Sequence, residues 1–435
     1  MKTIKLLIIT LLCTSISFAQ QTPGSKQTKD IAIMGATAHI GNGQVIDNSL
    51  IIIKDGKIAT VADATVVKMD LTNMEVINAN GKQVYPGFII PNSTLGLVEI
   101  DAVRATEDDA EIGGMIPHVR SIIAYNAESK VVEVTRPNGV LMGQITPRGG
   151  RISGTSSIVQ FDAWNWEDAT VKADDGIHLN WPNNYTRGRW WLGEDPGLKL
   201  NDKYSEQVAE VSSFFNETKA YSKGDKSSIN LPYQATEGLF DGSKKLYIHV
   251  DDAKGITDAI NFAKENKVTS MVIVGGAEAY KVGDLLKQNN IPILLMYSHT
   301  LPNSDDDDYD LPYKMAKLLV DKGVLVAIEN SGGKERMNAR NLPFYAGTTV
   351  AYGLTKEQAL SLITLNAAKI LGIDKDYGSL ETGKNATLFI SEGDALDMRT
   401  NQLTHAFING RAISLETHQT KLWHRYSEKY ESQKK

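Results

Sequence analysis

Short apolar strands alternate with amphipathic helices between Lys245 and Gly372, and this rhythm limits the possible folds more than any other feature. The apolar runs of strand length are LYIHV, MVIVGG, IPILLMY and VLVAIE. The segment after the first run has its apolar residues on one helical face, at Ile256, Ala259, Ile260 and Ala263. Repeated strand–helix units predict a parallel sheet, either doubly wound or closed into a barrel. No GxGxxG follows the first strand, which weakens the nucleotide-binding form of the doubly wound sheet.

Both ends of the chain have β patterns instead. From Ile31 to Val84 the pattern is of β type, and two apolar runs surround Asp55-Gly56, a strong hairpin signal. The β pattern returns at residues 378–413. We therefore expect the two ends to pair into one small β domain beside a barrel. Residues 140–245, which hold five of the six tryptophans, are interpreted as early barrel strands with a long loop or insertion.

The first residues have the layout of a secretory signal peptide. Lys2 and Lys5 give a positive start, an apolar run follows, and Ser17-Phe18-Ala19 places small residues before a cleavage site. The apolar run is too short for a span of about 20 residues. We predict a cleaved signal at residues 1–19, a flexible leader at 20–30, and export to the periplasm or the cell exterior, with no integral membrane segment after cleavage.

The composition of the mature chain excludes several kinds of site. Cys13 is the only cysteine and lies inside the predicted signal, so disulfides and thiolate zinc sites are excluded. Removing Lys2 and Lys5 from the 46 basic residues leaves 44 against 52 acidic residues. No basic cluster stands out, so no nucleic-acid partner is expected. No G-x-S-x-G occurs, which disfavours a serine hydrolase.

Three segments carry a family resemblance: QVYPGFIIPNSTLGL, NARNLPFYAGTTVAYGLTKEQALSLITLNAAKILGI and YGSLETGKNATLFI. They are similar to the first barrel strand, the last helices and the return to the β domain of amidohydrolases. Over residues 31–413 the chain resembles the imidazolonepropionase-like branch of that superfamily. The resemblance implies hydrolysis of non-peptide C–N bonds, in cyclic amides or small peptides. It also implies a TIM-like (β/α)8 barrel at 87–372, a small β-sandwich domain built from 31–86 and 373–413, and a C-terminal tail at 414–435.

The resemblance further implies a divalent metal such as zinc, held at strand ends by an H-x-H pair, two more histidines and a proton-transferring aspartate. In strand order the corresponding residues here are Asn92, Thr94, His249, Gly275 and Ser331, with Asn330 as the alternative to Ser331. Only His249 keeps the family's residue type. One imidazole and a few neutral oxygens cannot hold a catalytic zinc, so we predict no firmly bound cofactor and weak or absent activity.

The same positions give two further expectations. Their side chains should converge at the C-terminal mouth of the barrel, with no carboxylate in place of the aspartate. Restoring the ligands should recover metal binding if the backbone has kept its geometry. The four substitutions required are Asn92→His, Thr94→His, Gly275→His and Ser331→Asp.

Several alternatives stay open at this point. The chain is either an exported hydrolase with a rearranged site, or a non-catalytic relative that binds a small molecule or a catalytically complete paralogue; it could also form a homo-oligomer. His249 is either a surviving ligand or proton-transfer base, or a hydrogen-bonded relic without partners. His299 either faces the functional end of the barrel or caps a turn. Trp190 and Trp191 either contact substrate or pack against the barrel wall.

Overall fold

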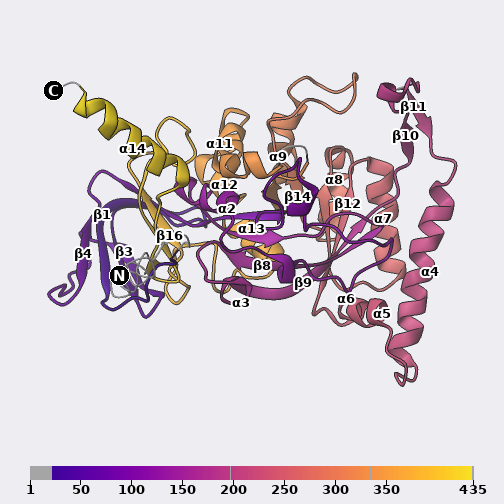
Figure 1. Cartoon of the computed structure of the whole chain (residues 1–435), viewed down its shortest axis with the longest axis horizontal. Helices are drawn as coiled ribbons and strands as arrows, with labels where there is room; N and C mark the ends of the chain where they lie inside the picture. The colour runs from indigo at the N-terminus through magenta and orange to yellow at the C-terminus, as the bar shows by residue number, and fades with distance from the viewer. Residues whose placement is uncertain (1–21, 196, 333–334, 434–435) are drawn as a thin grey trace, which may run out of the picture.

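The computed structural model describes residues 22–195, 197–332 and 335–433. Figure 1 shows a β sheet built from both chain ends beside a larger α/β body. The predicted signal peptide lies outside the described residues. Within the described part of the chain, no helix has the length and apolar character needed to cross a membrane.

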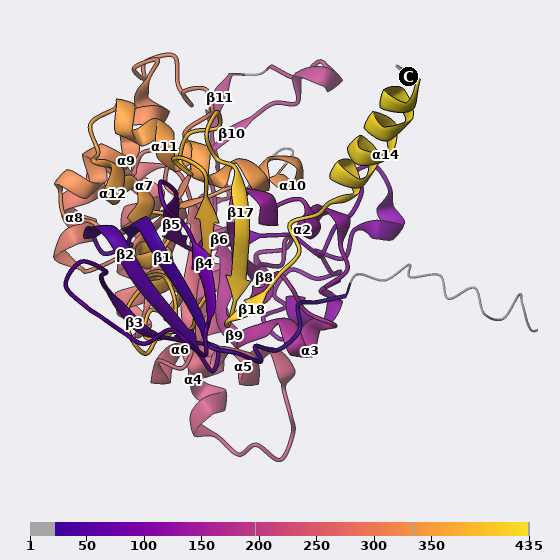
Figure 2. The ribbon, with the colours of Figure 1, turned by 90° about the vertical axis from the view of Figure 1, so that its left-hand side faces the viewer.

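The sheet beside the barrel combines strands from both ends of the chain (Figure 2). β5 is the junction, because it runs parallel to β1 and antiparallel to β16. All eight strands therefore belong to one hydrogen-bonded sheet, with β4 branching from β1, where a sandwich would have two separately bonded sheets. The strands are β1 (Ile31–His39), β2 (Val45–Lys54), β3 (Lys57–Asp63), β4 (Glu75–Asn78), β5 (Gln83–Pro86), β16 (Leu388–Ser391), β17 (Leu403–Ile408) and β18 (Arg411–Ala412).

Local sequence explains the start of this sheet. Asp55 and Gly56 both have positive φ, 50° and 78°, as the tight turn between β2 and β3 requires. Inward-facing residues of both chain ends share one apolar core, which includes Ile33, Ile51 and Leu388. This shared core holds the two ends together.

A second eight-stranded sheet curls into the barrel. Its order is β6 (Phe88–Ser93), β7 (Val140–Ile145), β8 (Ile152–Gln160), β9 (Thr170–Asn180), β12 (Lys245–Val250), β13 (Met271–Gly275), β14 (Ile293–Met296) and β15 (Val326–Glu329). The backbone N–H groups of Ile89 in β6 and Ile328 in β15 donate to the carbonyls of Ile363 and Leu362. These bonds close the ring and confirm the predicted TIM-like α/β fold.

The barrel departs from eight strand–helix repeats on one side. β8 runs antiparallel to both β7 and β9. The links at 146–151 and 161–169 are shorter than the dozen or so residues that a parallel crossover needs, so short connections replace the crossover helices there. The second link contains only the four-residue helix α3 (Trp166–Ala169). The long excursion follows β9 and contains β10 (Tyr185–Arg187), β11 (Leu198–Leu200), α4 (Tyr204–Lys223), α5 (Leu231–Thr236) and α6 (Gly238–Asp241).

The helices follow their sequence signals. Asp252 caps α7 (Ala253–Glu265), because its carboxylate accepts from Gly255 N at 2.8 Å. Thr355 and Gln358 form the expected capping box of α12 (Lys356–Ser361). The other helices are α2 (Lys130–Glu133), α3 (Trp166–Ala169), α8 (Gly283–Gln288), α9 (Leu311–Asp321), α10 (Glu335–Asn338), α11 (Leu342–Ala351), α13 (Leu365–Leu371) and α14 (His418–Ser432).

The barrel interior has two layers. The lower layer is apolar, is covered by α13, and contains Ile89, Met142, Ile158, Tyr247, Val272, Leu294 and Ala327. Side chains two residues apart on a strand share a face, so the next inward positions lie one layer higher. Those positions are polar on four strands: Gln144, Ser156, His249 and Glu329. The upper layer is therefore a polar floor beneath the mouth of the barrel.

Candidate functional site

Asn92 is the central polar residue at the end of β6. It is fully buried and has φ of +50°, a conformation that asparagine tolerates better than most residues. Its Nδ2 donates to Glu329 at 3.1 Å, and its backbone N donates to Gln144 Oε1 at 3.0 Å. Asn92 thereby ties the first barrel strand to the second and to the last.

Glu329, the last residue of β15, is a buried carboxylate at this floor. It accepts from Ser331 N at 2.5 Å and from Ser331 Oγ at 2.9 Å. Burial raises the pKa of Glu329 to about 7, against the lowering effect of the bonds from Ser331. The sequence predicted that no carboxylate would replace the family's proton-transferring aspartate, which corresponds to Ser331. This prediction was wrong, because Glu329, two positions before Ser331, places a carboxylate there.

Arg148, in the turn after β7, supplies the positive charge. Its guanidinium donates to Asn92 O at 2.8 Å, to Asn92 Oδ1 at 3.0 Å, and to Glu335 at 3.1 Å. Glu335 is buried, whereas about a quarter of the Arg148 side chain is exposed. A guanidinium is always charged and binds oxygen atoms with a forked geometry, so this cation can receive an anionic or carbonyl group at the mouth.

Thr94 lies in the same cluster. Its backbone N donates to Glu335 at 2.6 Å and its hydroxyl accepts from Arg336 at 2.7 Å. Arg336 in turn donates to Asp101 at 2.6 Å. Asn330 is also engaged, since its Nδ2 donates to the Glu335 carbonyl. We call Asn92, Thr94, Arg148, Glu329, Ser331, Glu335 and Arg336 the charged cluster.

His249 has a partner, contrary to the expectation drawn from the sequence. Its Nε2 lies 2.9 Å from Nδ1 of His178 on the neighbouring strand β9. Burial and the charge of Arg148 lower the pKa of His249 to about 3. Burial likewise lowers the pKa of His178 well below its usual range. Both rings are therefore neutral at physiological pH.

The His178 ring connects to a further polar group below it. Its Nε2 lies 2.9 Å from Ser156 Oγ, and Ser156 donates to Asp175 at 2.7 Å. Gln144 Nε2 also donates to Asp175, at 3.0 Å, so the chain of contacts continues through Gln144 to Asn92. We call Asp175, Ser156, His178 and His249 the histidine relay.

Gly275 ends β13 beside an apolar pocket. Its φ is +92°, and a Cβ atom there would lie 2.6 Å from Asp251 Oδ1. The Gly275→His replacement is therefore strained, and the four restored ligands should not suffice to rebuild a metal site. The adjoining pocket encloses about 420 Å³, open solvent at its entrance included, and its apolar lining includes Leu295, Tyr297, Pro302, Leu311 and Met315.

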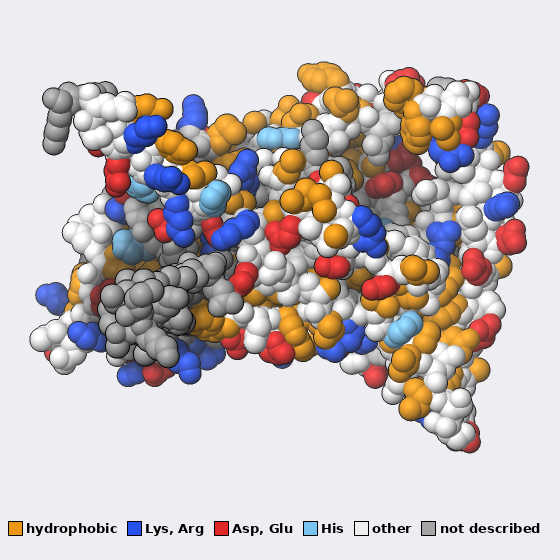
Figure 3. Space-filling model, viewed as in Figure 1, with side chains coloured by type: hydrophobic (Ala, Val, Ile, Leu, Met, Phe, Trp, Pro, Cys, Tyr) orange, Lys and Arg blue, Asp and Glu red, His pale blue; other side chains and the backbone are white. Residues whose placement is uncertain are grey.

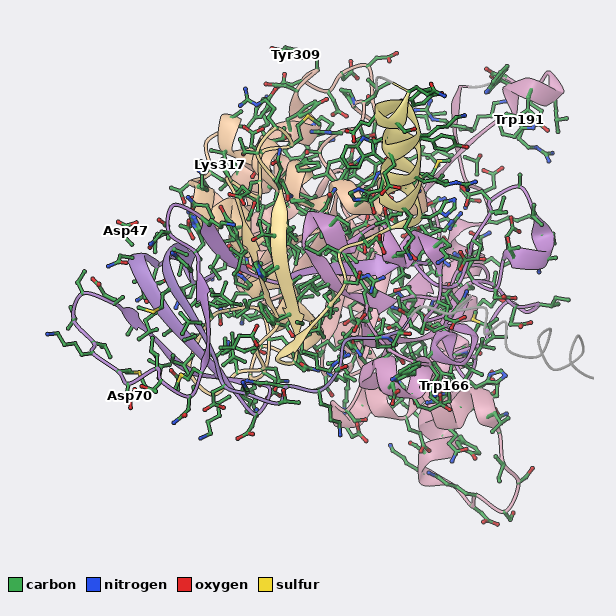
Figure 4. All side chains as sticks on the ribbon, turned by 60° about the vertical axis from the view of Figure 1, so that its left-hand side comes forward. Asp47, Asp70, Trp166, Trp191, Tyr309 and Lys317 are labelled. Carbon is green, nitrogen blue, oxygen red and sulfur yellow. The ribbon has the colours of Figure 1, made fainter. Side chains whose placement is uncertain are left out.

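The remaining predicted contacts do not reach this floor. His299 Nε2 lies 2.7 Å from Thr348 Oγ1 on α11, so it ties a loop to a helix. Trp190 and Trp191 are 71% and 65% exposed on the arm formed by β10 and β11. Figure 4 shows Trp191 on this projecting arm, away from the barrel. The two tryptophans neither line the floor nor pack on the barrel wall.

The donor set does not fit a catalytic zinc, which needs three or more available ligands. Asn92 Oδ1 accepts from Arg148, the Thr94 hydroxyl accepts from Arg336, and Gly275 has no donor atom. His249 Nε2 is engaged by His178, so His249 could offer only its Nδ1, one donor where three are needed. Among residues 22–195, 197–332 and 335–433, no three His, Cys, Asp or Glu side chains gather in an arrangement suited to a metal ion. A guanidinium also stands among these groups and would repel a divalent ion.

Sequence reasoning missed Glu335, Glu329, His178 and Asp175, whereas Arg148 lies in TPRGGRISG, a Gly-rich segment that gives a weak indication of an anion-binding loop. Two of them had usable signals. Glu329 is a carboxylate that ends the apolar run VLVAIE, and His178 lies in GIHLN, which matches the pattern of His249 in YIHV. Glu335 and Asp175 carry no local signal, because their roles depend on contacts between distant segments.

Comparison with known proteins agrees with this architecture. The Amidohydrolase family matches residues 314–413. The imidazolonepropionase of Picrophilus torridus is 28% identical over 86% of this chain and 94% of its own length. That of Flavobacterium johnsoniae is 22% identical over 88% of this chain and 93% of its own.

A solved structure shows the same fold. The amidohydrolase from Thermotoga maritima MSB8 has a TM-score of 0.76 and 23% identity, and the match covers 88% of this chain and 99% of that one. Sequence and fold thus agree from the composite sheet through the barrel. In sequence and in fold, the chain is similar to the imidazolonepropionase-like branch of the amidohydrolase superfamily.

Proposed function

We propose that the barrel mouth binds a small molecule through a carboxylate or amide carbonyl, with Arg148 as its cation, and that metal-dependent hydrolysis has been lost. The contact of Arg148 with Asn92 and Glu335 is the observation that carries this proposal. A partly exposed guanidinium held by a buried carboxylate is preorganised for a planar oxygen group. The relatives named imidazolonepropionase support a cyclic amide as the ligand class.

Calorimetric titration tests the proposal with two matched ligands. 2-Pyrrolidone-5-carboxylate carries a lactam and a carboxylate, and cyclopentanecarboxylate keeps the ring and carboxylate without the lactam. We expect the lactam to bind more tightly, and Arg148→Met to weaken its binding at least about tenfold, since a charged hydrogen bond contributes roughly 1.5–3 kcal/mol. Arg120→Met is the control, because Arg120 pairs with Asp174 outside the charged cluster. Equal binding by wild type and Arg148→Met would refute the proposal.

A second candidate function is metal-free hydrolysis of a C–N bond in a cyclic amide. The observation that favours it is Glu329, whose pKa of about 7 suits a general base. Glu329 would take a proton from water as the water oxygen adds to the carbonyl carbon, and Arg148 would face the resulting oxyanion. The protonated Glu329 would then return its proton to the departing nitrogen. Ring opening of the lactam in the presence of a chelator, abolished by Glu329→Gln, would favour this candidate over binding alone.

We also propose that the protein acts outside the cytoplasm. The support is the order of positive, apolar and small residues from Lys2 to Ala19. The N-terminal sequence of the exported protein should begin near Gln20. Recovery of a cytoplasmic chain that keeps Met1 would contradict this proposal.

A further inference from the structure

The histidine relay sets which nitrogen of His249 carries its proton. We propose that Asp175, Ser156 and His178 act as positioning residues that hold His249 as the Nε2–H tautomer, so that its Nδ1 is presented at the barrel mouth as a hydrogen-bond acceptor. The inference follows from counting donors and acceptors along the relay, starting at its buried end.

Asp175 fixes the direction of the relay. It is fully buried and accepts three hydrogen bonds, from Ser156 Oγ at 2.7 Å, Tyr247 Oη at 2.8 Å and Gln144 Nε2 at 3.0 Å. A carboxylate can only accept, so the single hydroxyl proton of Ser156 lies on its bond to Asp175. The Ser156 oxygen is thereby left as an acceptor toward its other neighbours.

The two rings then have one consistent arrangement. His178 Nε2, 2.9 Å from Ser156 Oγ, must donate, which leaves Nδ1 of this neutral ring as an acceptor. His249 Nε2, 2.9 Å from that Nδ1, must donate in turn. The parallel stacking of His178 on Tyr247, at 4.7 Å between ring centres, keeps the middle ring in place. The proton of neutral His249 is thus on Nε2, and Nδ1 keeps its lone pair.

The lone pair of His249 Nδ1 is available to a ligand. His249 is the penultimate residue of β12 and its side chain is partly exposed. Within the described part of the chain, no group forms a hydrogen bond with Nδ1. This atom is also not fully buried, so a ligand can reach it. Arg148 lies near enough for its charge to lower the pKa of His249. If the proposed function holds, a ligand bound to Arg148 that also reaches His249 would present an N–H or O–H group to Nδ1.

The tautomers can be measured directly without any ligand. Long-range ¹H–¹⁵N correlation spectra of the full mature chain, labelled at histidine, distinguish a protonated ring nitrogen from an unprotonated one. We expect pyrrole-type Nε2 and pyridine-type Nδ1 resonances for both His178 and His249 at neutral pH, with assignments from His178→Gln and His249→Gln. A protonated Nδ1 on His249 would overturn the proposal, whatever the outcome of the Arg148 titrations.

One substitution should invert the relay. In Asp175→Asn the new amide can donate to Ser156 Oγ. The freed hydroxyl can reach the Gly176 carbonyl at 3.3 Å or His178 Nε2 at 2.9 Å. We expect it to take the shorter bond to His178, so that each ring exchanges its protonated nitrogen. Ser157→Ala is the matched control, because Ser157 follows Ser156 on β8, is equally buried, and its hydroxyl accepts from Asp174 N rather than joining the relay. Exchange of both histidine patterns in Asp175→Asn, with none in the control, supports the relay. Unchanged tautomers in a folded Asp175→Asn protein would overturn it, and the wild-type spectrum decides the matter if that variant does not fold.

Discussion

The two sides of the barrel mouth handle charge in opposite ways. The charged cluster at the ends of β6 and β15 holds Arg148 against the buried carboxylate of Glu335, whereas the histidine relay on β8, β9 and β12 keeps two imidazoles neutral. A metal-dependent member of the family needs these sides to share one ion. Here the positive charge on one side is a guanidinium, and on the other side the two imidazoles bond to each other.

Removing the cation should produce the largest effect. In Arg148→Met, the buried Glu335 and the nearby Glu329 lose their positive partner, so the free energy of unfolding should fall by about 3–5 kcal/mol. Urea denaturation at pH 8 measures this change. Arg120→Met removes a partly exposed pair and should cost less than about 1 kcal/mol. Similar losses in the two variants would show that Arg148 is an ordinary surface arginine.

The pH dependence of stability should differ in sign between the two sides. The pKa of Glu329 is about 7 in the fold against a usual 4.5, so the folded chain keeps a proton that the unfolded chain loses between these values. Its contribution to stability therefore falls as pH rises from about 4.5 to 7, by about 3 kcal/mol. Glu329→Gln removes this dependence. The unfolding free energy of the variant minus that of the wild type should rise between pH 4.5 and 7. A difference that does not change with pH would contradict the raised pKa of Glu329.

His249 should give the opposite slope. Its pKa falls from 6.5 to about 3 on folding, so its contribution is complete above pH 6.5 and is lost as pH falls toward 3. Relative to wild type, His249→Gln should therefore become more stable as pH drops below 6.5. A relative stability that does not change with pH would show that this histidine is not neutralised by the fold.

A smaller effect should stay within the histidine relay. Tyr247→Phe keeps the ring that stacks on His178 and removes one donor to Asp175. A hydrogen bond to a buried charge contributes roughly 1.5–3 kcal/mol, so unfolding free energy should fall by about that amount. Lactam affinity measured by calorimetry should be unchanged. Lost affinity would mean that the two sides of the mouth are coupled.

The smallest effect is expected on the arm. Trp190→Ser and Trp191→Ser alter side chains that are mostly exposed, so stability and lactam binding should change by less than about 0.5 kcal/mol. Figures 1 and 3 show how far this part of the molecule projects from the barrel. A loss of binding in either variant would mean that the arm closes over the mouth.

The strands and helices from Lys245 to Gly372 could be predicted because their signals are local: apolar runs, helix faces and caps. The antiparallel β8 could not, since its direction depends on short turns rather than on its own residues. The site residues divide in the same way, into those with local signals and those whose roles depend on distant contacts. The sequence placed Asn92 and His249 at strand ends, yet their partners Arg148 and His178 come from segments that only the closed barrel brings near.

Metal content tests the central claim most directly. The mature protein should be purified without chelators from cells grown with added zinc, manganese and iron, then analysed by inductively coupled plasma mass spectrometry. Because Arg148 stands among groups that already bond to one another, we predict far less than one ion per chain. One tightly held ion per chain, lost together with lactam hydrolysis on chelation, would contradict the account.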